Sequence, residues 1–359
     1  MSTHPGSSIR LVDVARGRDN NFQLLRFLAA TAVILFHSYA LTGHLTEEPL
    51  WRSASELNFG LLGVGCFFVI SGFLVTQSWL ARARLLPFLA ARALRIYPAL
   101  AIATLFSIVL AAGSIDPPIG AFLGDPLTVD YLWRNALGWE VVNELPGAYV
   151  GNPYPYAVNG SLWTLPIELR LYALLAVAGV IGLLSRRYAW TLIVGTLVAV
   201  FVVRPEWFPL SPNISVIREL ALLFALGSIA YIWRAALPLS LAGLGAALAL
   251  IVVNPAGIGR GVLFDPLLTY AVLTVAYHPA LQWRAFNGLG DYSYGLYVYS
   301  FPIQQTIVYV MPEASPMLLF AMAMLITLAV AALSWHMVEK PMLGLKSHFH
   351  RTGPSTANA

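Results

Sequence analysis

The stretch LNFGLLGVGCFFVISGFLVTQSWL, residues 57–80, carries no charged side chain over 24 residues. A helix of about 20 apolar residues is long enough to cross the hydrocarbon core of a bilayer, so this stretch predicts a transmembrane helix. Similar runs recur along the chain, which is 58% hydrophobic and only 11% charged. Ordinary soluble domains contain roughly 25% charged residues. The sequence therefore predicts an integral membrane protein.

Ten such stretches predict an all-α fold, a polytopic transmembrane helix bundle. One membrane domain, residues 22–340, lies between two short polar tails, residues 1–21 and 341–359. The first apolar run is too long for a signal-peptide core and lacks a small-residue cleavage site, so we expect a retained helix. The predicted spans are 22–42, 57–80, 96–115, 161–184, 188–204, 216–234, 238–254, 261–278, 289–311 and 316–336.

The basic residues predict the orientation of these spans. If the N-terminus is cytoplasmic, fourteen of the 21 Lys and Arg residues fall in cytoplasmic segments, four outside and three within spans. Cytoplasmic loops of membrane proteins carry an excess of Lys and Arg, so both termini are predicted to be cytoplasmic. The longest connection, residues 116–160, is rich in Pro, Gly, Trp and Tyr, and we expect it to dip into the membrane interface.

Composition also excludes several kinds of site. The basic residues stand between apolar segments, which argues against a nucleic-acid partner. Cys66 is the single cysteine and lies inside an apolar run, so neither a disulfide framework nor a thiolate cluster is expected. No His, Asp and Glu grouping has the spacing of metal ligands, and His278 and His336 are expected to be structural.

The first span carries two polar residues, Arg26 and His37. Their separation of 11 residues is close to three helical turns, which places both on one face about 16 Å apart. Charges are costly in a bilayer, so they mark interior or functional positions. Snorkelling to the interface is the better explanation for Arg26 alone. His37 lies in the outer half of its span and can accept a proton from a hydroxyl near neutral pH.

The fourth span contains a second polar stripe. Three of its residues recur every four positions and share a face: Thr164, Glu168 and Tyr172. Counted from the outer edge, Glu168 lies about 10 Å deep and His37 about 8 Å deep. This match predicts a pair in which the Glu168 carboxylate orients the imidazole, so that the two residues act as a unit. The alternative is a structural ion pair of Glu168 with Arg170 or Arg218.

The ninth span has polar residues at i, i+4, i+7 and i+11: Ser293, Tyr297, Ser300 and Gln304. Hydroxyls and amides on one face favour a wet, substrate-lining surface. Hydrogen bonds between neighbouring helices explain the same pattern equally well. Pro302 is expected to loosen this helix and to free a backbone carbonyl beside the stripe.

The cytoplasmic connection after the second span contains Arg92 and Arg95. The two residues are three apart and share a face if this segment is helical. Two guanidinium groups make a good phosphate clamp. Spacing alone slightly favours the other interpretation, anchoring to anionic lipid.

These pieces together resemble the acyltransferase-3 family of integral membrane O-acyltransferases, and the resemblance runs from about Asn21 to Pro341. Five pieces carry it: Arg26 with His37; Gly63-Val64-Gly65-Cys66-Phe67-Phe68-Val69-Ile70-Ser71-Gly72-Phe73-Leu74; Arg92-Ala93-Leu94-Arg95-Ile96-Tyr97-Pro98; Ser161-Leu162-Trp163 with Glu168 and Tyr172; and Ser293-Tyr294-Gly295-Leu296-Tyr297 with Pro302. The closing Glu339-Lys340-Pro341 is similar too. In two places the chain departs from the family pattern. Gly65 stands where an acidic residue is usual, and Ser300 stands where a His is common.

The resemblance implies an enzyme that moves an acyl group, usually acetyl, from cytoplasmic acyl-CoA to a hydroxyl. The acceptor is commonly a sugar of a lipid-linked or surface polysaccharide. By this resemblance His37 is the catalytic base or carries the acyl group. Arg92 and Arg95 face the CoA phosphates, and Arg26 supports the donor path.

The same resemblance gives the expected partners and location. Acyl-CoA is a co-substrate, and no cofactor is bound permanently. Tyr172 and the ninth-span stripe are expected to line the substrate path. We expect a multi-pass protein in the lipid of the bacterial inner membrane.

Two other functions are compatible with buried polar residues. A secondary transporter would use such residues as a proton relay: Arg26, His37, Glu168, Arg170 and Glu219. Transporters often show inverted repeats or paired broken helices, and neither is visible in the sequence. A membrane scaffold would need no pairing of His37 with Glu168.

Overall fold

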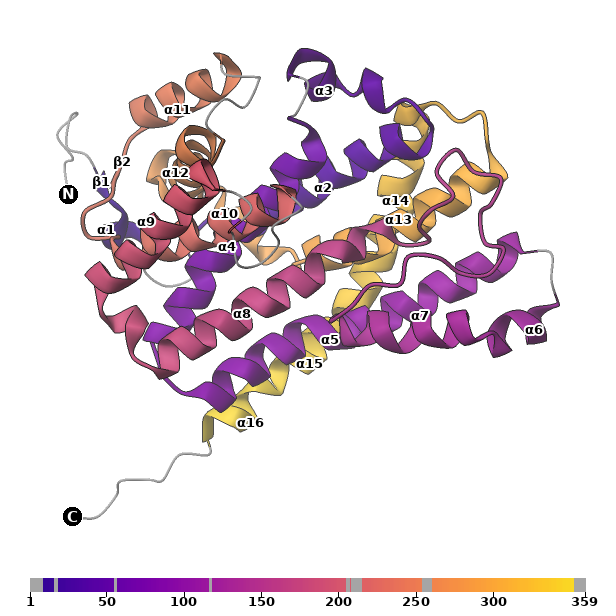
Figure 1. Cartoon of the computed structure of the whole chain (residues 1–359), viewed down its shortest axis with the longest axis horizontal. Helices are drawn as coiled ribbons and strands as arrows, with labels where there is room; N and C mark the ends of the chain where they lie inside the picture. Colours follow the sequence, from indigo (N-terminus) through magenta and orange to yellow (C-terminus); the bar gives the residue numbers. More distant parts are fainter. Residues whose placement is uncertain are drawn as a thin grey trace.

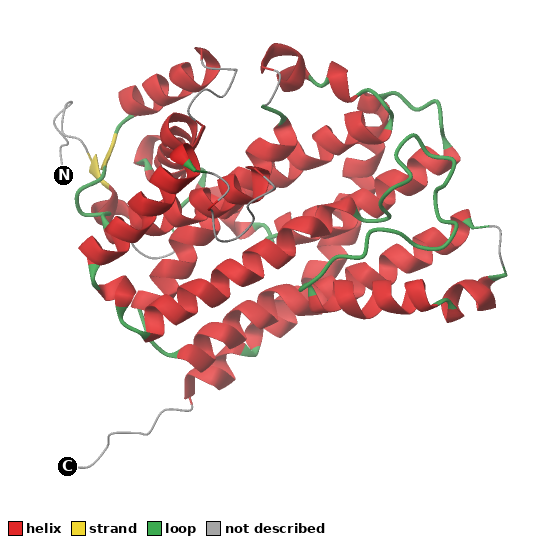
Figure 2. Cartoon of the chain, in the orientation of Figure 1, coloured by secondary structure: helices red, strands yellow, loops and turns green. Residues whose placement is uncertain are grey.

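The computed structural model describes residues 9–15, 19–54, 57–115, 118–204, 207, 215–253 and 260–351. These residues are almost wholly helical, which confirms the predicted all-α class (Figure 2). Within them, the only strands are β1 (Ile9–Arg10) and β2 (Pro238–Leu239), which pair antiparallel. The predicted tails lie partly outside the described residues, which exclude 1–8, 16–18 and 352–359.

Each of the ten predicted spans corresponds to a helix. They are α2 (Phe22–Leu41), α4 (Phe59–Leu80), α5 (Leu85–Ala111), α8 (Leu165–Val180), α9 (Arg187–Val203), α10 (Ser215–Ile232), α11 (Leu241–Val253), α12 (Asp265–Tyr277), α13 (Ser293–Val310) and α14 (Pro316–Ser334). Among the described residues, six helical stretches are long and apolar enough to cross a membrane: those that contain α2, α4, α5, α8, α10 and α14. The chain is therefore a multi-pass membrane protein, and the exact number of spans stays a prediction.

Shorter helices complete the described chain. They are α1 (Leu11–Val14), α3 (Pro49–Ala54), α6 (Ile119–Gly124), α7 (Pro126–Leu137), α15 (Lys340–Gly344) and α16 (Lys346–Arg351). A 3-10 turn, η3 (Gly160–Thr164), leads into α8, and a π-helical turn, η9 (Trp335–Glu339), joins α14 to α15. Helical structure thus continues past residue 340, where the sequence predicted a polar tail, and α15 and α16 pack against α5.

The helices run between two ends of the bundle, which we name after the predicted topology. At the inner end, α2 and α13 begin and α14 finishes, and the ion pairs of Arg26 and Arg95 lie there. At the outer end, α2 and α13 finish. Figure 1 places α16 at the left-hand, inner end and α6 at the right-hand, outer end.

Two boundaries differ from the predicted ones in a way that matters for the site. Helix α5 begins at Leu85, eleven residues before the predicted start at residue 96. Arg92 and Arg95 therefore lie inside a continuous helix, so the predicted start of this span was eleven residues too late, while the cytoplasmic location of the two arginines stays a prediction. The prediction started the span after the two arginines because it relied on uninterrupted apolar runs. Both guanidinium groups point into the bundle interior, where Ser78 and Asp291 bind them.

The connection between α5 and α8 returns into the bundle. Helix α7 packs along α5 and ends at Gly138, which has a left-handed backbone with φ 65°. A Cβ atom at Gly138 would lie 3.0 Å from the Leu100 side chain and 3.2 Å from that of Leu169. Leu100 is near the middle of α5, so this connection packs against the bundle well below the outer end of α5, and its depth relative to the membrane interface stays a prediction.

Close contact between α4 and α10 depends on glycine. A Cβ atom at Gly72 would lie 1.9 Å from the backbone oxygen of Phe224, and one at Gly227 would lie 2.3 Å from that of Val69. In a bilayer, helices associate through close packing of small residues because lipid supplies no hydrophobic driving force. The two glycines let the helix backbones touch, and α4 in turn carries one wall of the site.

We expect Gly72→Ala to lower the melting temperature of the purified protein in detergent. The added methyl group meets backbone rather than a movable side chain, and overpacking of this kind costs about 1–3 kcal/mol. Gly195→Ala in α9 is the matched control, since no atom lies within 4 Å of its added Cβ. An equal change in melting temperature for both variants would contradict the close-packing argument.

Candidate active site

A cavity of about 240 Å³ opens among α2, α4, α5, α8 and α13 near the inner end. Its wall is apolar on the α4 side, where Phe67, Phe68 and Leu74 line it. Its polar lining comes from Ser71 of α4 and from six other helical segments: α2, α5, η3, α8, α13 and α16. The polar residues are Arg26, Ser71, Arg92, Arg95, Thr164, Glu168, Tyr172, Ser293, Tyr294, Tyr297 and Lys346. The cavity thus gathers most of the residues that the sequence predicted for the site.

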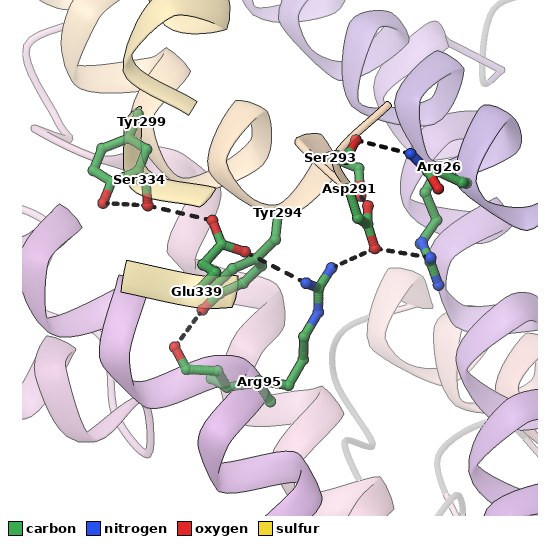
Figure 3. Close-up of polar contacts among 11 residues, drawn as sticks. Arg26, Arg95, Asp291, Ser293, Tyr294, Tyr299, Ser334 and Glu339 are labelled. Atoms are coloured by element: carbon green, nitrogen blue, oxygen red, sulfur yellow. Dashed lines mark hydrogen bonds and ion pairs between the residues drawn. The ribbon is translucent and has the colours of Figure 1, made fainter. Parts of the chain in front are cut away.

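Asp291 holds the basic side of this cavity together. Its Oδ2 accepts hydrogen bonds from Arg26 at 2.8 Å and from Arg95 at 2.9 Å, as Figure 3 shows. Arg95 also forms an ion pair with Glu339 at 3.4 Å, and Ser293 donates to the second oxygen of Asp291. Burial alone would raise the pKa of Asp291, which precedes α13, but Arg26 and Arg95 outweigh it and lower this pKa to about 2.

Arg92 has a different environment from Arg95. Its guanidinium donates to Ser78 Oγ at 3.1 Å and lies over the Phe88 ring at 4.4 Å. Among the described residues it forms no ion pair. Arg95, by contrast, forms ion pairs with two carboxylates, one through each of its terminal nitrogens. The two arginines do line one cavity, but Arg92 keeps more donors available for an anionic ligand.

Glu168 lies inside the cavity, below the level of His37. Its Oε1 accepts hydrogen bonds from Tyr172 and, at 3.0 Å, from Ser71, and these two hydroxyls also contact each other at 2.7 Å. Thr164, one turn above Glu168 on the same face, shares a 2.7 Å hydrogen bond with Tyr297. The predicted stripe along this helix therefore faces the cavity.

His37 lies outside the cavity, toward the outer end. Its ring packs edge to face against Phe301, with ring centroids 4.9 Å apart, and it is 9% exposed. No described residue offers a hydrogen-bond partner to its Nδ1. A buried imidazole nitrogen without a partner is unusual and marks a position where a ligand group can be received.

The predicted His37–Glu168 pair does not form. A Cβ atom at Gly160 would lie 2.6 Å from the Phe301 ring, so Gly160 and His37 both lie at the level of Phe301. Glu168 follows eight residues later, about 12 Å deeper. The depth count was wrong because α8 and its leading turn begin beneath residues 143–159, which cover them at the outer end.

The ninth-span stripe divides between two environments. Ser293 and Tyr297 line the cavity, as predicted. Ser300 and Gln304 are fully buried and do not line it. The Gln304 amide donates to Ile34 O at 2.9 Å and Ser38 Oγ at 2.7 Å, so the interhelical alternative is correct for this residue.

A proton relay through the buried charges is not supported. Arg170 is exposed on α8, with its guanidinium over the Trp139 ring at 5.6 Å. It therefore points away from Glu168, as their two-residue spacing suggested. Among the described residues, His37 has no hydrogen-bonded link to Arg26 or Glu168.

The sequence analysis did not assign a site role to the lining residues Ser71, Tyr294 and Lys346, or to Asp291, which binds two of the cavity's arginines. The available signal for Asp291 was its place two residues before the Ser-Tyr-Gly-Leu-Tyr motif that begins at Ser293, at the inner end of a helix. Lys346 lies beyond the predicted last span, so only the continued helix brings it to the cavity. Among the described residues, no group of three or more His, Cys, Asp or Glu is placed to hold a metal ion.

Comparison with known proteins agrees with this architecture. Residues 19–336 match the acyltransferase-3 family, described as an acyltransferase domain. An O-acetyl transferase of Shigella phage Sf6 is 28% identical over 91% of this chain and 96% of its own length. Nodulation protein 10 of Rhizobium leguminosarum bv. viciae is 28% identical over 92% of this chain and 95% of its own length. No solved structure matches the chain.

The helix bundle and its enclosed polar cavity define a multi-pass membrane enzyme. The chain belongs to the acyltransferase-3 family, because the match covers most of its length. It is therefore an acyltransferase, and the cavity is its candidate active site.

We expect Asp291→Asn to destabilise the protein, because it leaves the partly buried Arg26 guanidinium without a carboxylate and leaves Arg95 with Glu339 alone. Removing one partner of a fully buried ion pair costs about 3–5 kcal/mol. The exposure of Arg26 (24%) and Arg95 (26%) makes the loss smaller here. Melting temperatures in detergent measure it, and Asp130→Asn, which removes an exposed ion pair with Arg134, is the control and should have little effect.

The same pair of proteins gives a pH test. The folded-state pKa of Asp291 lies below its ordinary value of 3.8, so its stabilisation is complete above that value and is lost as pH falls toward 2. The difference in melting temperature between wild type and Asp291→Asn should therefore stay constant down to about pH 4 and shrink below it. A difference that grew on acidification would contradict this role of Asp291.

Proposed function

We propose that this enzyme transfers an acetyl group from acetyl-CoA to a hydroxyl of a carbohydrate or lipid-linked glycan. The observation that carries the proposal is the arrangement of two features along α13. A cavity rich in arginine lies near the inner end, and an imidazole with a free nitrogen lies about two turns farther out. The name of the phage relative, an O-acetyl transferase, supports acetyl transfer to oxygen.

The donor is assigned to the cavity. Arg92 and Lys346 line it near the inner end and supply positive charge for the phosphates of CoA, while Arg26 and Arg95 are held by Asp291. Guanidinium groups suit phosphate oxygens because they donate two parallel hydrogen bonds. The apolar wall of α4 suits the uncharged pantetheine arm, which then directs the thioester toward Tyr297.

His37 is assigned the role of general base. The acceptor hydroxyl gives its proton to Nδ1 of His37 as its oxygen attacks the thioester carbonyl. The new C–O bond forms, the C–S bond breaks, and the CoA thiolate leaves and takes up a proton. The thioester must pass the Tyr297–Thr164 hydrogen bond to reach this level, so that pair marks the boundary between donor cavity and base.

Glu168 receives a role separate from that of His37. Bonded to Ser71 and Tyr172, it forms the polar wall of the donor cavity opposite Arg92. We place the protein in the bacterial inner membrane, where acetyl-CoA is available on the cytoplasmic side. The direct test is transfer of label from [14C]acetyl-CoA to glycan by the purified protein, and its absence would overturn the proposal.

We expect His37→Ala to reduce transfer by about 10²–10⁴-fold, the usual contribution of a positioned base. Acetyl-CoA binding should persist, because His37 does not line the cavity. His278→Ala is the control, since that histidine caps a turn by accepting a hydrogen bond from the Ala280 N–H. Full activity of His37→Ala would rule out its role as base.

The separation of Glu168 from His37 predicts how their substitutions combine. Sites more than about 7–10 Å apart without shared partners act independently. The losses of His37→Ala and Glu168→Gln should therefore multiply in the double variant. A double variant no slower than His37→Ala would show that the two residues act as one unit after all.

We expect Arg92→Ala to raise the KM for acetyl-CoA about tenfold or more, since each charge-assisted hydrogen bond to a ligand contributes about 1.5–3 kcal/mol. Arg92→Lys should recover only part of the affinity, because an ammonium lacks the two-pronged geometry. Arg170→Ala is the control, because its guanidinium lies over Trp139 rather than in the cavity. An unchanged KM in Arg92→Ala would leave lipid anchoring as its role.

A further inference from the structure

The connection after α7 is fixed to α13 by buried amide groups. Asn152 Nδ2 donates to both the backbone oxygen (3.0 Å) and the side-chain oxygen (2.7 Å) of Gln305. Gln305 Nε2 donates in turn to the backbone oxygens of Tyr154 (2.8 Å) and Ala157 (2.7 Å). Satisfied polar groups in a buried network hold one conformation. The backbone that carries Tyr154 is therefore held in one place relative to α13.

Further contacts hold the two ends of this segment. The hydroxyl of Tyr149 contacts Thr306 Oγ1 at 2.8 Å, and Asn159 Nδ2 donates to Val298 O at 2.9 Å. Tyr149 is also buried in a small apolar cluster with Phe122 of α6. Although it contains little regular structure, the segment is tied at several points and has the rigidity that a binding surface requires.

Aromatic rings form a continuous line from this segment to the proposed base. Tyr156 is 66% exposed, and its ring stands at 90° to that of Tyr154 with centroids 5.6 Å apart. The Tyr154 ring meets Phe301 at 6.4 Å, and Phe301 meets His37 at 4.9 Å. The line thus begins at the surface and ends at the imidazole whose Nδ1 has no partner among the described residues.

Anchoring in the membrane interface is the simpler explanation of exposed tyrosines. It accounts for the exposure of Tyr156 alone. It does not account for an amide network that fixes Tyr154, or for the contact of Tyr154 with the ring that touches His37. A tyrosine that only anchors the protein needs to lie at the depth of the membrane interface. It needs neither a fixed backbone nor contact with the ring that touches His37.

We infer that Tyr156 and Tyr154 are the acceptor platform of this enzyme, on which a pyranose ring lies with one C–H face against the aromatic rings. The negative face of an aromatic ring attracts the weakly positive C–H groups of a sugar, and tyrosine hydroxyls can hydrogen-bond its hydroxyls. Phe301 contacts both Tyr154 and His37, so a sugar on the platform lies one aromatic ring away from the imidazole that is to take up its hydroxyl proton.

The platform rests on the proposed function and adds the acceptor's place and chemistry to it. The donor cavity and the platform lie on opposite sides of the Tyr297–Thr164 hydrogen bond. The acceptor therefore approaches from the outer end, and the donor from the inner end. The step itself is unchanged: the hydroxyl proton passes to His37, and the acetyl group passes from sulfur to the sugar oxygen.

The experiment uses the full-length protein in detergent, with [14C]acetyl-CoA as donor. The acceptor is envelope glycan from the source organism, freed of its O-acetyl esters by mild alkali. Initial rates are measured over a range of glycan concentrations for wild type, Tyr156→Ala and Tyr156→Trp. Tyr188→Ala is the matched control, because Tyr188 of α9 is 67% exposed and contacts Trp233 rather than the aromatic line.

We expect Tyr156→Ala to raise the KM for glycan roughly five- to tenfold, the change expected for loss of one aromatic contact. Its KM for acetyl-CoA should stay at the wild-type value. Tyr156→Trp should keep the wild-type KM for glycan, since the flat ring remains, and Tyr188→Ala should change neither constant.

Each other outcome has a distinct meaning. A wild-type KM for glycan in Tyr156→Ala, with active wild-type enzyme, would overturn the platform and leave the proposed function intact. An equal rise of the KM for glycan and the KM for acetyl-CoA in Tyr156→Ala would contradict the platform and support membrane anchoring as the role of Tyr156. The same rise in Tyr188→Ala would have the same meaning. Absence of transfer by the wild-type protein would overturn the proposed function and the platform with it.

Discussion

The shared carboxylate of Asp291 determines how the inner end of this bundle is assembled. Arg26 of α2 and Arg95 of α5 both bind one of its oxygens, and Arg95 also binds Glu339 at the end of η9, the turn that follows α14. A charge within a bilayer is costly unless it is paired or reaches water. The cluster therefore fixes the relative heights of four helices. The cavity is the space that remains beside this cluster, and Arg92 lines it from the adjacent turn of α5.

Helix α13 connects the two halves of the proposed site. Ser293 lies beside Asp291, Tyr297 one turn later lines the top of the cavity, and Phe301 another turn later touches His37. Because one rigid helix carries all three, the distance between cavity and imidazole is set by helical rise rather than by loops. Gln305, one turn farther out on α13, positions the segment that carries Tyr154, so this segment too is placed by the helix.

The sequence predicted much of the fold, because long apolar runs leave few alternatives to spanning helices. It also identified residues of the cavity, including Arg26, Arg92 and Glu168, since charges in apolar surroundings point to the bundle interior. Counting depth from a helix edge failed for Glu168, because an ordered segment covers the start of its helix. Asp291 escaped notice because its partners are hundreds of residues away, and Gln304 remained ambiguous because lining and interhelical amides follow the same spacing.

The ion pair between Arg26 and Asp291 also bears on how the protein is made. The two residues are 265 positions apart, so the first helix enters the membrane long before its counter-ion has been synthesised. At about 5–20 residues per second, the ribosome needs roughly 13 to 50 s to supply Asp291. During that interval the Arg26 guanidinium must reach the headgroup region, which its place near the start of α2 permits. Helix α2 is thus committed to the bilayer early, but its final position depends on the later synthesis of Asp291 and α13.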